Sequence, residues 1–205
     1  MRRADTCTNR CGKNYKASEP IVPPGGQFPI PATSGTPLLA FRCAPAIRPY
    51  LAEDVHSPAA VIIDTPITNT QVDGAVPIIL PAGGHAPVLA VTVSHGGKTL
   101  ASAHVPLNAS KVELPFSLAG LKPQKAPLDF TCSATLASSS SANAKPQKFS
   151  TSAQVSFLPN PPKGRSVTKM DLRTGALLAK PATGAEGPYD TVFPIGFYKI
   201  GRAHV

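Results

Sequence analysis

Apolar residues in this chain come in short bursts, and turn-forming residues separate one burst from the next. Valine, isoleucine, threonine and phenylalanine recur in these bursts, and such residues favour extended strands over helices. The bursts fall at 60–63, 76–80, 88–93, 99–105, 112–118, 128–136 and 149–158. Many short strands at this spacing are typical of a sandwich of two antiparallel sheets, so the pattern predicts an all-β fold.

Two of the bursts alternate strictly between apolar and polar residues, as a strand with one buried face does. In 128–136 the apolar face contains Phe130 and Cys132, and in 149–157 it contains Ala153 and Val155. The residues between them are mainly Ser, Thr, Asp and Gln, which predicts that the opposite face of each strand is solvated. A Gly96-Gly97 turn should join 88–93 to 99–105 as a hairpin.

Proline and glycine divide the chain into segments. Their density in residues 1–37 predicts a disordered or linker arm without paired strands, and the sandwich domain is expected over 38–160. Residues 161–191 are interpreted as a linker that holds a short extended pair, turned at Thr174-Gly175. The apolar segment 192–198 is interpreted as the first strand of a missing catalytic domain, which would leave an open apolar edge prone to aggregation.

The last residues carry a separate hypothesis about their origin. Residues 200–205 (IGRAHV) are the in-frame translation of ATCGGAAGAGCACACGTC, part of a widely used sequencing adapter. We therefore expect residues 199–205 to be an adapter-derived artefact.

Composition and charge exclude some functions. The net charge is +9, but aromatic residues make up 6% of the chain without interleaving the basic ones, so nucleic-acid binding is not expected. The same charge would also suit an interaction protein that binds its partner through the basic residues 1–50, a hypothesis that the sequence supports less well. The sequence contains no apolar run long enough to span a membrane, and the basic start at Met1 is not followed by the apolar stretch of a signal peptide.

Two features would suit a secreted protein. Cys43 and Cys132 could form a disulfide that staples the start of the sandwich to its core, whereas in the cytosol Cys132 would be a small buried apolar residue. The triplet that begins at Asn108 (NAS) is an N-glycosylation sequon between two expected strands. The C-x3-C pair at Cys7 and Cys11 lacks the further ligands of a zinc site, so no metal site is expected.

The residues do not form a recognisable catalytic set, and no cofactor is expected. The adjacent acids Glu53 and Asp54 are interpreted as a solvated turn, because neighbours on a strand point to opposite faces. The histidines lack metal-ligand spacing, and the sequence contains neither a nucleophile elbow nor a phosphate-binding loop.

Several segments resemble a known family. Residues 118–124 (LAGLKPQ), 128–134 (LDFTCSA) and 155–160 (VSFLPN) resemble the immunoglobulin-like sandwich that precedes the barrel of multidomain glycoside hydrolases. Residues 167–175 (VTKMDLRTG) and 192–198 (VFPIGFY) resemble the linker strand and the first barrel strand of fungal secreted glycoside-hydrolase-like proteins. The resemblance implies an immunoglobulin-like antiparallel β-sandwich and an extracellular location.

The resemblance also implies a role. Catalytic acids in such families lie at the ends of later barrel strands, so none is carried over to this chain. The chain would be a non-catalytic accessory front end whose partner is its own missing C-terminal domain, with a glycan as a further partner. The alternative is a free-standing structural or interaction β-sandwich without enzymatic activity.

Overall fold

A computed structural model describes residues 7–8, 14–15, 33–81, 87–137, 145–165, 167–181 and 187–193. The chain divides into two compact units, Met1–Thr33 and Ser34–Val205. The described part of the first unit contains an antiparallel pair of two-residue strands, β1 (Cys7–Thr8) and β2 (Asn14–Tyr15). The second unit contains the remaining strands and is described below.

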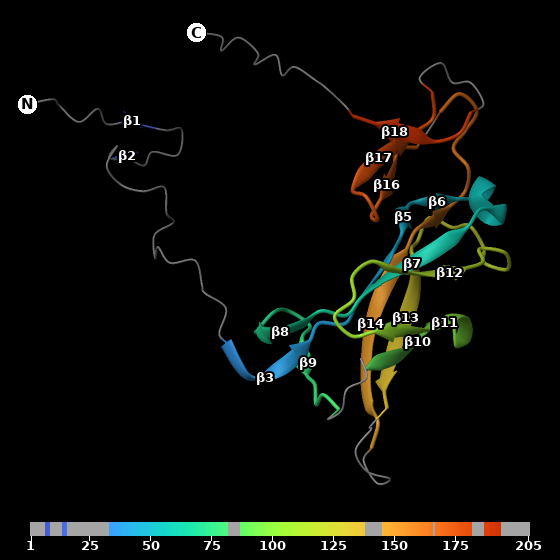
Figure 1. The fold of residues 1–205 in the computed structure, drawn as a ribbon. Coiled ribbons are helices and arrows are strands. Elements are labelled where there is room, and N and C mark those ends of the chain that lie inside the picture. The colour runs from blue at the N-terminus through green and yellow to red at the C-terminus, as the bar shows by residue number, and fades with distance from the viewer. Residues whose placement is uncertain are drawn as a thin grey trace, which may run out of the picture. The chain divides into compact units, whose positions relative to one another are not determined.

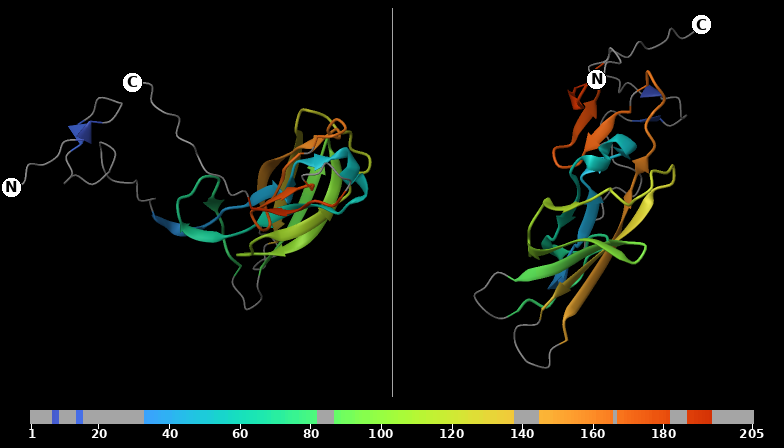
Figure 2. Two further views of the ribbon diagram at one scale, coloured as in Figure 1. Left: turned by 90° about the horizontal axis from the view of Figure 1, so that it is seen from above. Right: turned by 90° about the vertical axis from the view of Figure 1, so that its right-hand side faces the viewer.

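The second unit is an all-β sandwich, as the sequence predicts, and its two main sheets are antiparallel (Figure 1). One sheet has the strand order β12-β7-β4, formed by β4 (Arg42–Pro45), β7 (Ala59–Asp64) and β12 (Val112–Phe116). The other has the order β11-β10-β13-β14, formed by β10 (Val88–His95), β11 (Lys98–Pro106), β13 (Leu128–Leu136) and β14 (Gln147–Val155). Figure 2 shows these strands from two further directions.

The core lies between the two sheets and follows from the alternation in the sequence. Every second residue of β13 is buried, and Phe130 and Cys132 are fully so. Strand β14 repeats the pattern, because Phe149, Ala153 and Val155 face the same core. Burial of large side chains such as Phe130 and Val155 stabilises the fold by about 1.5 to 3 kcal/mol each, and this apolar cluster therefore holds the sheets together.

The hairpin between β10 and β11 forms at the two glycines that the sequence singles out. Gly96 and Gly97 have φ values of 56° and 79°, a left-handed conformation that glycine adopts without steric cost. Two consecutive residues of this kind match the right-handed twist of the flanking strands. The register then shifts between Val93 and Ser94, where the ladder is irregular.

Two of the expected strands differ in detail, and strand β4 was not expected. The burst at 76–80 supplies only β9 (Val76–Pro77), which belongs to a small sheet of order β8-β3-β9 outside the sandwich layers. The burst at 149–158 is divided at Ser156, and β15 (Phe157–Leu158) pairs in parallel with β6 (Tyr50–Leu51). Strand β4 is not among the expected bursts, because its sequence RCAP has no apolar alternation.

The first strand of this unit begins inside the arm expected over residues 1–37. Strand β3 (Thr33–Leu39) lies between β8 (Ile67–Thr70) and β9. Pro37 lacks an N–H group, but its carbonyl accepts a hydrogen bond from the N–H of Ile78 at 3.0 Å. The contact uses only the carbonyl of Pro37, an acceptor that the proline ring leaves intact.

The extended pair expected after residue 161 is present as a hairpin. Strands β16 (Lys169–Asp171) and β17 (Ala176–Ala179) pair antiparallel, and β18 (Asp190–Val192) pairs with β17. Together with β5 (Ile47–Arg48) they form a sheet of order β18-β17-β16-β5, called the C-terminal sheet below. Most of the strand expected at 192–198 and the whole of 199–205 lie outside the described residues.

Candidate functional site

The C-terminal sheet is joined to the sandwich through a shared stretch of backbone. Strand β16 pairs with β5, which matches Met170 with Arg48 and Asp171 with Ile47. The N–H of Leu172 then donates to the carbonyl of Ala46 at 2.8 Å. Because β5 lies between β4 and β6 in the chain, residues 167–193 are attached at this end of the sandwich (Figure 1).

A small apolar cluster supports this attachment. Ala46, Ala60 and Ile62 are buried on the outer side of β7, and Leu172 packs against them. Strand β7 is consequently buried on both faces, since Val61 and Ile63 point into the main core. A strand covered on both sides is expected to have a continuous apolar sequence, as the AAVII run of β7 does.

A buried ion pair joins β16 to the short 3-10 helix η1 (Ala52–His56). The ammonium of Lys169 lies 2.6 and 2.8 Å from the two carboxylate oxygens of Asp54, and the side chains are 4% and 16% exposed. The N–H of Leu51 donates to the same carboxylate at 2.7 Å and fixes its orientation. A buried ammonium requires such a partner, because removing a charge from water costs several kcal/mol.

The interpretation of Glu53 and Asp54 as a solvated turn is therefore wrong for Asp54. Glu53 is more exposed and pairs with Lys180 at 2.9 Å. Its N–H donates to the side-chain oxygen of Asn160 at 2.8 Å, so η1 is held from two directions. In the 3-10 turn, the carboxylates of Glu53 and Asp54 both point toward lysines of the C-terminal segment. On a strand, as the sequence suggested, these two neighbours would point to opposite faces.

Tyr189 completes this group of side chains, which we call the junction cluster: Glu53, Asp54, Lys169, Lys180 and Tyr189. The ammonium of Lys169 lies 3.9 Å from the centre of the Tyr189 ring, a distance suited to a cation–π interaction. The phenol oxygen is buried. Burial, followed by the negative charges of Glu53 and Asp54, raises the pKa of Tyr189 to about 12. The phenol therefore keeps its proton at physiological pH.

A second set of charges fixes the turn between β16 and β17. Arg173 contacts Asp171 at 2.8 Å and Glu113 of β12 at 3.5 Å, and Lys111 donates to the carbonyl of Arg173. Burial opposes ionisation of Asp171, but the hydrogen bonds and charge of Arg173 outweigh it and lower the pKa of that carboxyl. The turn is thus tied to the sheet that contains β12.

The chemistry of the junction cluster is that of a structural tie. Each carboxylate is matched by one lysine, and the lysines come from the C-terminal segment while the acids come from η1. Sequence reasoning did not identify Lys169 or Tyr189, because a single lysine in a three-residue strand carries no periodic pattern. The alternation of Lys169 and Asp171 about an exposed Met170 indicates only that the two share a face.

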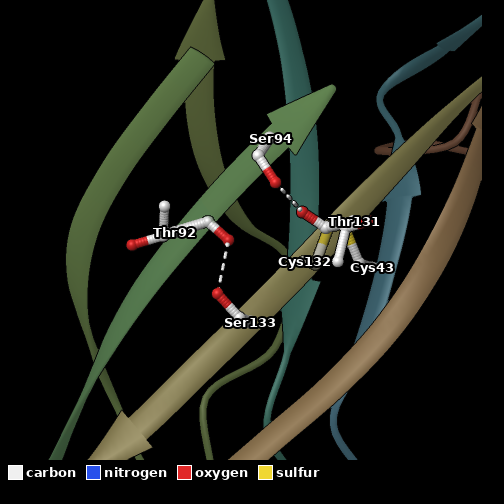
Figure 3. The surroundings of a disulfide bond; sticks show 6 residues. All are labelled: Cys43, Thr92, Ser94, Thr131, Cys132 and Ser133. Carbon is white, nitrogen blue, oxygen red and sulfur yellow. Dashed lines mark hydrogen bonds between the residues drawn. A yellow bond between two sulfur atoms is a disulfide. The ribbon is translucent and has the colours of Figure 1, made fainter. Parts of the chain in front are cut away.

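The two cysteines singled out in the sequence are joined in the structure. Cys43 lies in β4 and Cys132 in β13, with an S–S distance of 2.04 Å and a Cα–Cα distance of 6.4 Å. These strands belong to opposite sheets, so the bond crosses the core and links the layers. Figure 3 shows both cysteines beside Thr131 and Ser133. The hydroxyl of Ser133 donates to the carbonyl of Thr92.

Asn108 lies in the loop between β11 and β12, where its side chain is exposed. Its backbone is held in a left-handed conformation with φ of 58°, and its N–H donates to the carbonyl of Thr65 at 2.8 Å. The hydroxyl of Ser110 donates to Asp64 at 3.1 Å. The loop thus presents the asparagine to solvent, and its glycosylation stays a prediction.

Other candidate sites carry little chemistry. Among the described residues, no group of three or more His, Cys, Asp or Glu side chains has the arrangement of a metal site. A cavity of about 400 Å³ lies between β9 and β14, with Phe41 and Phe149 in its lining. None of the helices in the described part of the chain is long and apolar enough to cross a membrane.

Comparison of the chain with protein-family models, curated proteins and solved structures finds no match.

Proposed function

We propose that this chain is the non-catalytic front module of a secreted glycoside-hydrolase-like protein, and that it holds the segment leading to the next domain in a fixed position. The observation that carries the proposal is the anchoring of the C-terminal sheet on the sandwich. Backbone pairing with β5, the packing of Leu172 and the Lys169–Asp54 ion pair act on the same short segment. A passive linker needs none of these contacts.

The strand order supports an immunoglobulin-like assignment within this proposal. Taken in chain order, β4, β7, β10, β11, β12, β13 and β14 correspond to strands A, B, C, C′, E, F and G. The A, B and E strands then form one sheet, and the C′, C, F and G strands form the other, a variant of the immunoglobulin arrangement. The disulfide departs from that family's B–F bridge, because it joins the A and F positions.

The secreted location rests on the disulfide and the exposed sequon. A disulfide between the two layers of a sandwich forms and persists in oxidising compartments, and cytosolic thiols stay reduced. Asn108 is placed in an exposed loop, where a glycan would project into solvent without displacing any core residue. Both features suit an extracellular module.

Sequencing of the transcript beyond the codon for Tyr198 tests the proposal. A following barrel predicts about 250 further residues of alternating strands and helices, with acidic residues at the ends of later strands. A stop codon directly after this segment, or a continuation without such alternation, would rule out the hydrolase assignment and favour a free-standing sandwich.

A further inference from the structure

The charged side chains that are buried in this protein lie in the C-terminal sheet rather than in the sandwich. Among the described residues, the buried charged residues are Lys169, which is 4% exposed, and Asp171, which is 8% exposed. Both belong to β16 and point inward, on either side of the exposed Met170. The main core of the sandwich is instead a cluster of apolar residues that includes Phe130 and Val155. The two parts of the fold therefore depend on different interactions.

Within the described residues, three ion pairs join the C-terminal segment to the sandwich, and in each pair the acid belongs to the sandwich side. The pairs are Lys169 with Asp54, Lys180 with Glu53, and Arg173 with Glu113. The first is buried and the other two are partly exposed, so the first should contribute most to the attachment. Protonation of the acids leaves the cations of the C-terminal segment without counter-charges.

Lys169 is enclosed by groups from two other segments. Both carboxylate oxygens of Asp54 contact its ammonium, and the ring of Tyr189, which precedes β18, lies 3.9 Å away. Lys180 lies 5.3 Å from the same ring, and His56 is exposed at the end of η1. Chiefly because of burial, the pKa of Tyr189 is raised to about 12, so the phenol stays neutral in acid. Of the two groups that contact Lys169, Asp54 is the one that acid discharges.

Asp171 is kept ionised by the turn that follows it. Burial opposes its ionisation, but the hydrogen bonds and charge of Arg173 outweigh burial and lower the pKa of Asp171 from its ordinary value of 3.8. Such a carboxyl contributes stability above the ordinary value and loses that contribution as the pH falls through the lowered one. Lys111 and Glu113 also contact Arg173, so the same turn holds a further cation and a further acid. The contribution of Asp171 is thus present at neutral pH and lost in acid.

We propose that the C-terminal sheet is an acid-sensitive attachment, which leaves the sandwich when its carboxylates take up protons while the sandwich itself stays folded. Once Asp54 is neutral, the ammonium of Lys169 is buried without a counter-charge, which is strongly unfavourable, and detachment returns it to water. Backbone pairing of β16 with β5 at two positions and the packing of Leu172 are the contacts that remain. The inference rests on the proposed function, since it states when the segment leading to the next domain is held.

The sandwich is expected to withstand the same acid. The buried residues of β10 and β13 are apolar, and the disulfide between Cys43 and Cys132 joins the two layers without a titrating group. Asp64 of β7 accepts hydrogen bonds from Ser110 and from the N–H of Lys111, and its protonation affects an exposed loop only. Acid therefore removes interactions from the attachment and leaves those of the core.

Native-state hydrogen exchange of the full chain between about pH 7 and about pH 3 tests the proposal. Protection factors, which correct for the intrinsic effect of pH on exchange, are compared between the pair β16 and β17 and the pair β10 and β13. We expect the protection of β16 and β17 to fall by about a hundredfold or more in acid, as loss of a buried charge partner predicts. The protection of β10 and β13 should change by less than about threefold.

Replacing the ion pair by apolar side chains should remove most of this acid response. In the double variant Asp54→Leu with Lys169→Met, β16 and β17 should stay protected at both pH values, apart from the smaller contribution of Asp171. Asp54→Asn should instead expose them already at neutral pH, because a neutral partner leaves the ammonium uncompensated. Asp73→Asn is the matched control, because Asp73 is an exposed acid in the turn between β8 and β9, and it should leave the acid response unchanged.

Three results would overturn the inference. One is protection of β16 and β17 that is the same in acid as at neutral pH. Another is an equal fall in the protection of β10 and β13, which would mean that the whole unit unfolds together. The third is a double variant that responds to acid as strongly as the wild type. Absence of protection in β16 and β17 at neutral pH is a distinct result, since it would defeat the anchoring itself and with it the proposed function.

Discussion

Replacing Cys43 and Cys132 together by alanine is expected to lower the free energy of unfolding by about 4 to 5 kcal/mol. The bond closes a segment with a sequence separation of 89 residues, and closure of a loop of this length removes much conformational entropy from the unfolded chain. A loss of this size is a large fraction of the stability of a typical domain. Guanidinium denaturation of the oxidised protein measures it through the shift in the midpoint.

The matched control for this experiment is the double substitution Cys7→Ala with Cys11→Ala, which removes two cysteines without opening the Cys43–Cys132 bridge. It should leave the midpoint unchanged, and the wild type unfolded and refolded in reductant should resemble the Cys43→Ala, Cys132→Ala variant. A loss below about 1 kcal/mol in that variant, or titration of four free thiols in the oxidised wild type, would contradict the prediction.

Asp54→Ala is expected to destabilise the C-terminal sheet by about 3 to 5 kcal/mol. The substitution leaves the ammonium of Lys169 without its carboxylate at a position where the side chain is 4% exposed. The effect should be local, with β16 to β18 becoming sensitive to protease while the disulfide-linked sandwich stays folded. Limited proteolysis and denaturation with probes in each part measure it.

Three further variants separate the charge from the packing. Lys169→Met should cost less than Asp54→Ala, because Asp54 lies nearer to solvent and keeps the hydrogen bond from Leu51. Combining Asp54→Leu with Lys169→Met should recover most of the loss, since two apolar side chains leave no unpaired charge. Glu53→Ala is the control, because its pair with Lys180 is 31% and 27% exposed and should contribute at most about 1 kcal/mol. Equal losses in Asp54→Ala and Glu53→Ala would contradict the role of the buried pair.

The strands of the sandwich could be predicted from the sequence because their physical cause is local. In β13 and β14 each apolar residue alternates with a polar one, so Phe130 and Val155 identify the buried face without knowledge of the partner strand. The β10–β11 hairpin is equally local, since Gly96 and Gly97 determine the turn. Strand β4 could not be predicted in this way, because its sequence RCAP has no alternation.

The junction could not be predicted because its contacts join residues far apart in the chain. Lys169 meets Asp54 across a separation of 115 residues, and neither residue lies in a motif. Residues 161–191 have the proline and glycine content of a linker, although Leu172 and the ion pairs anchor part of this segment to the sandwich. The AAVII run of β7 was the available indication, because a strand buried on both faces requires a further layer over its outer side.

Native-state hydrogen exchange of the C-terminal sheet tests most directly whether the sandwich holds this segment in place. The amides of Met170, Asp171 and Leu178 should exchange with protection approaching that of β10 and β13, and Leu172→Ala should reduce their protection while leaving that of the sandwich unchanged. Exchange of these three amides at the rate of an unstructured peptide in the wild-type chain would contradict the anchoring on which the proposed function depends.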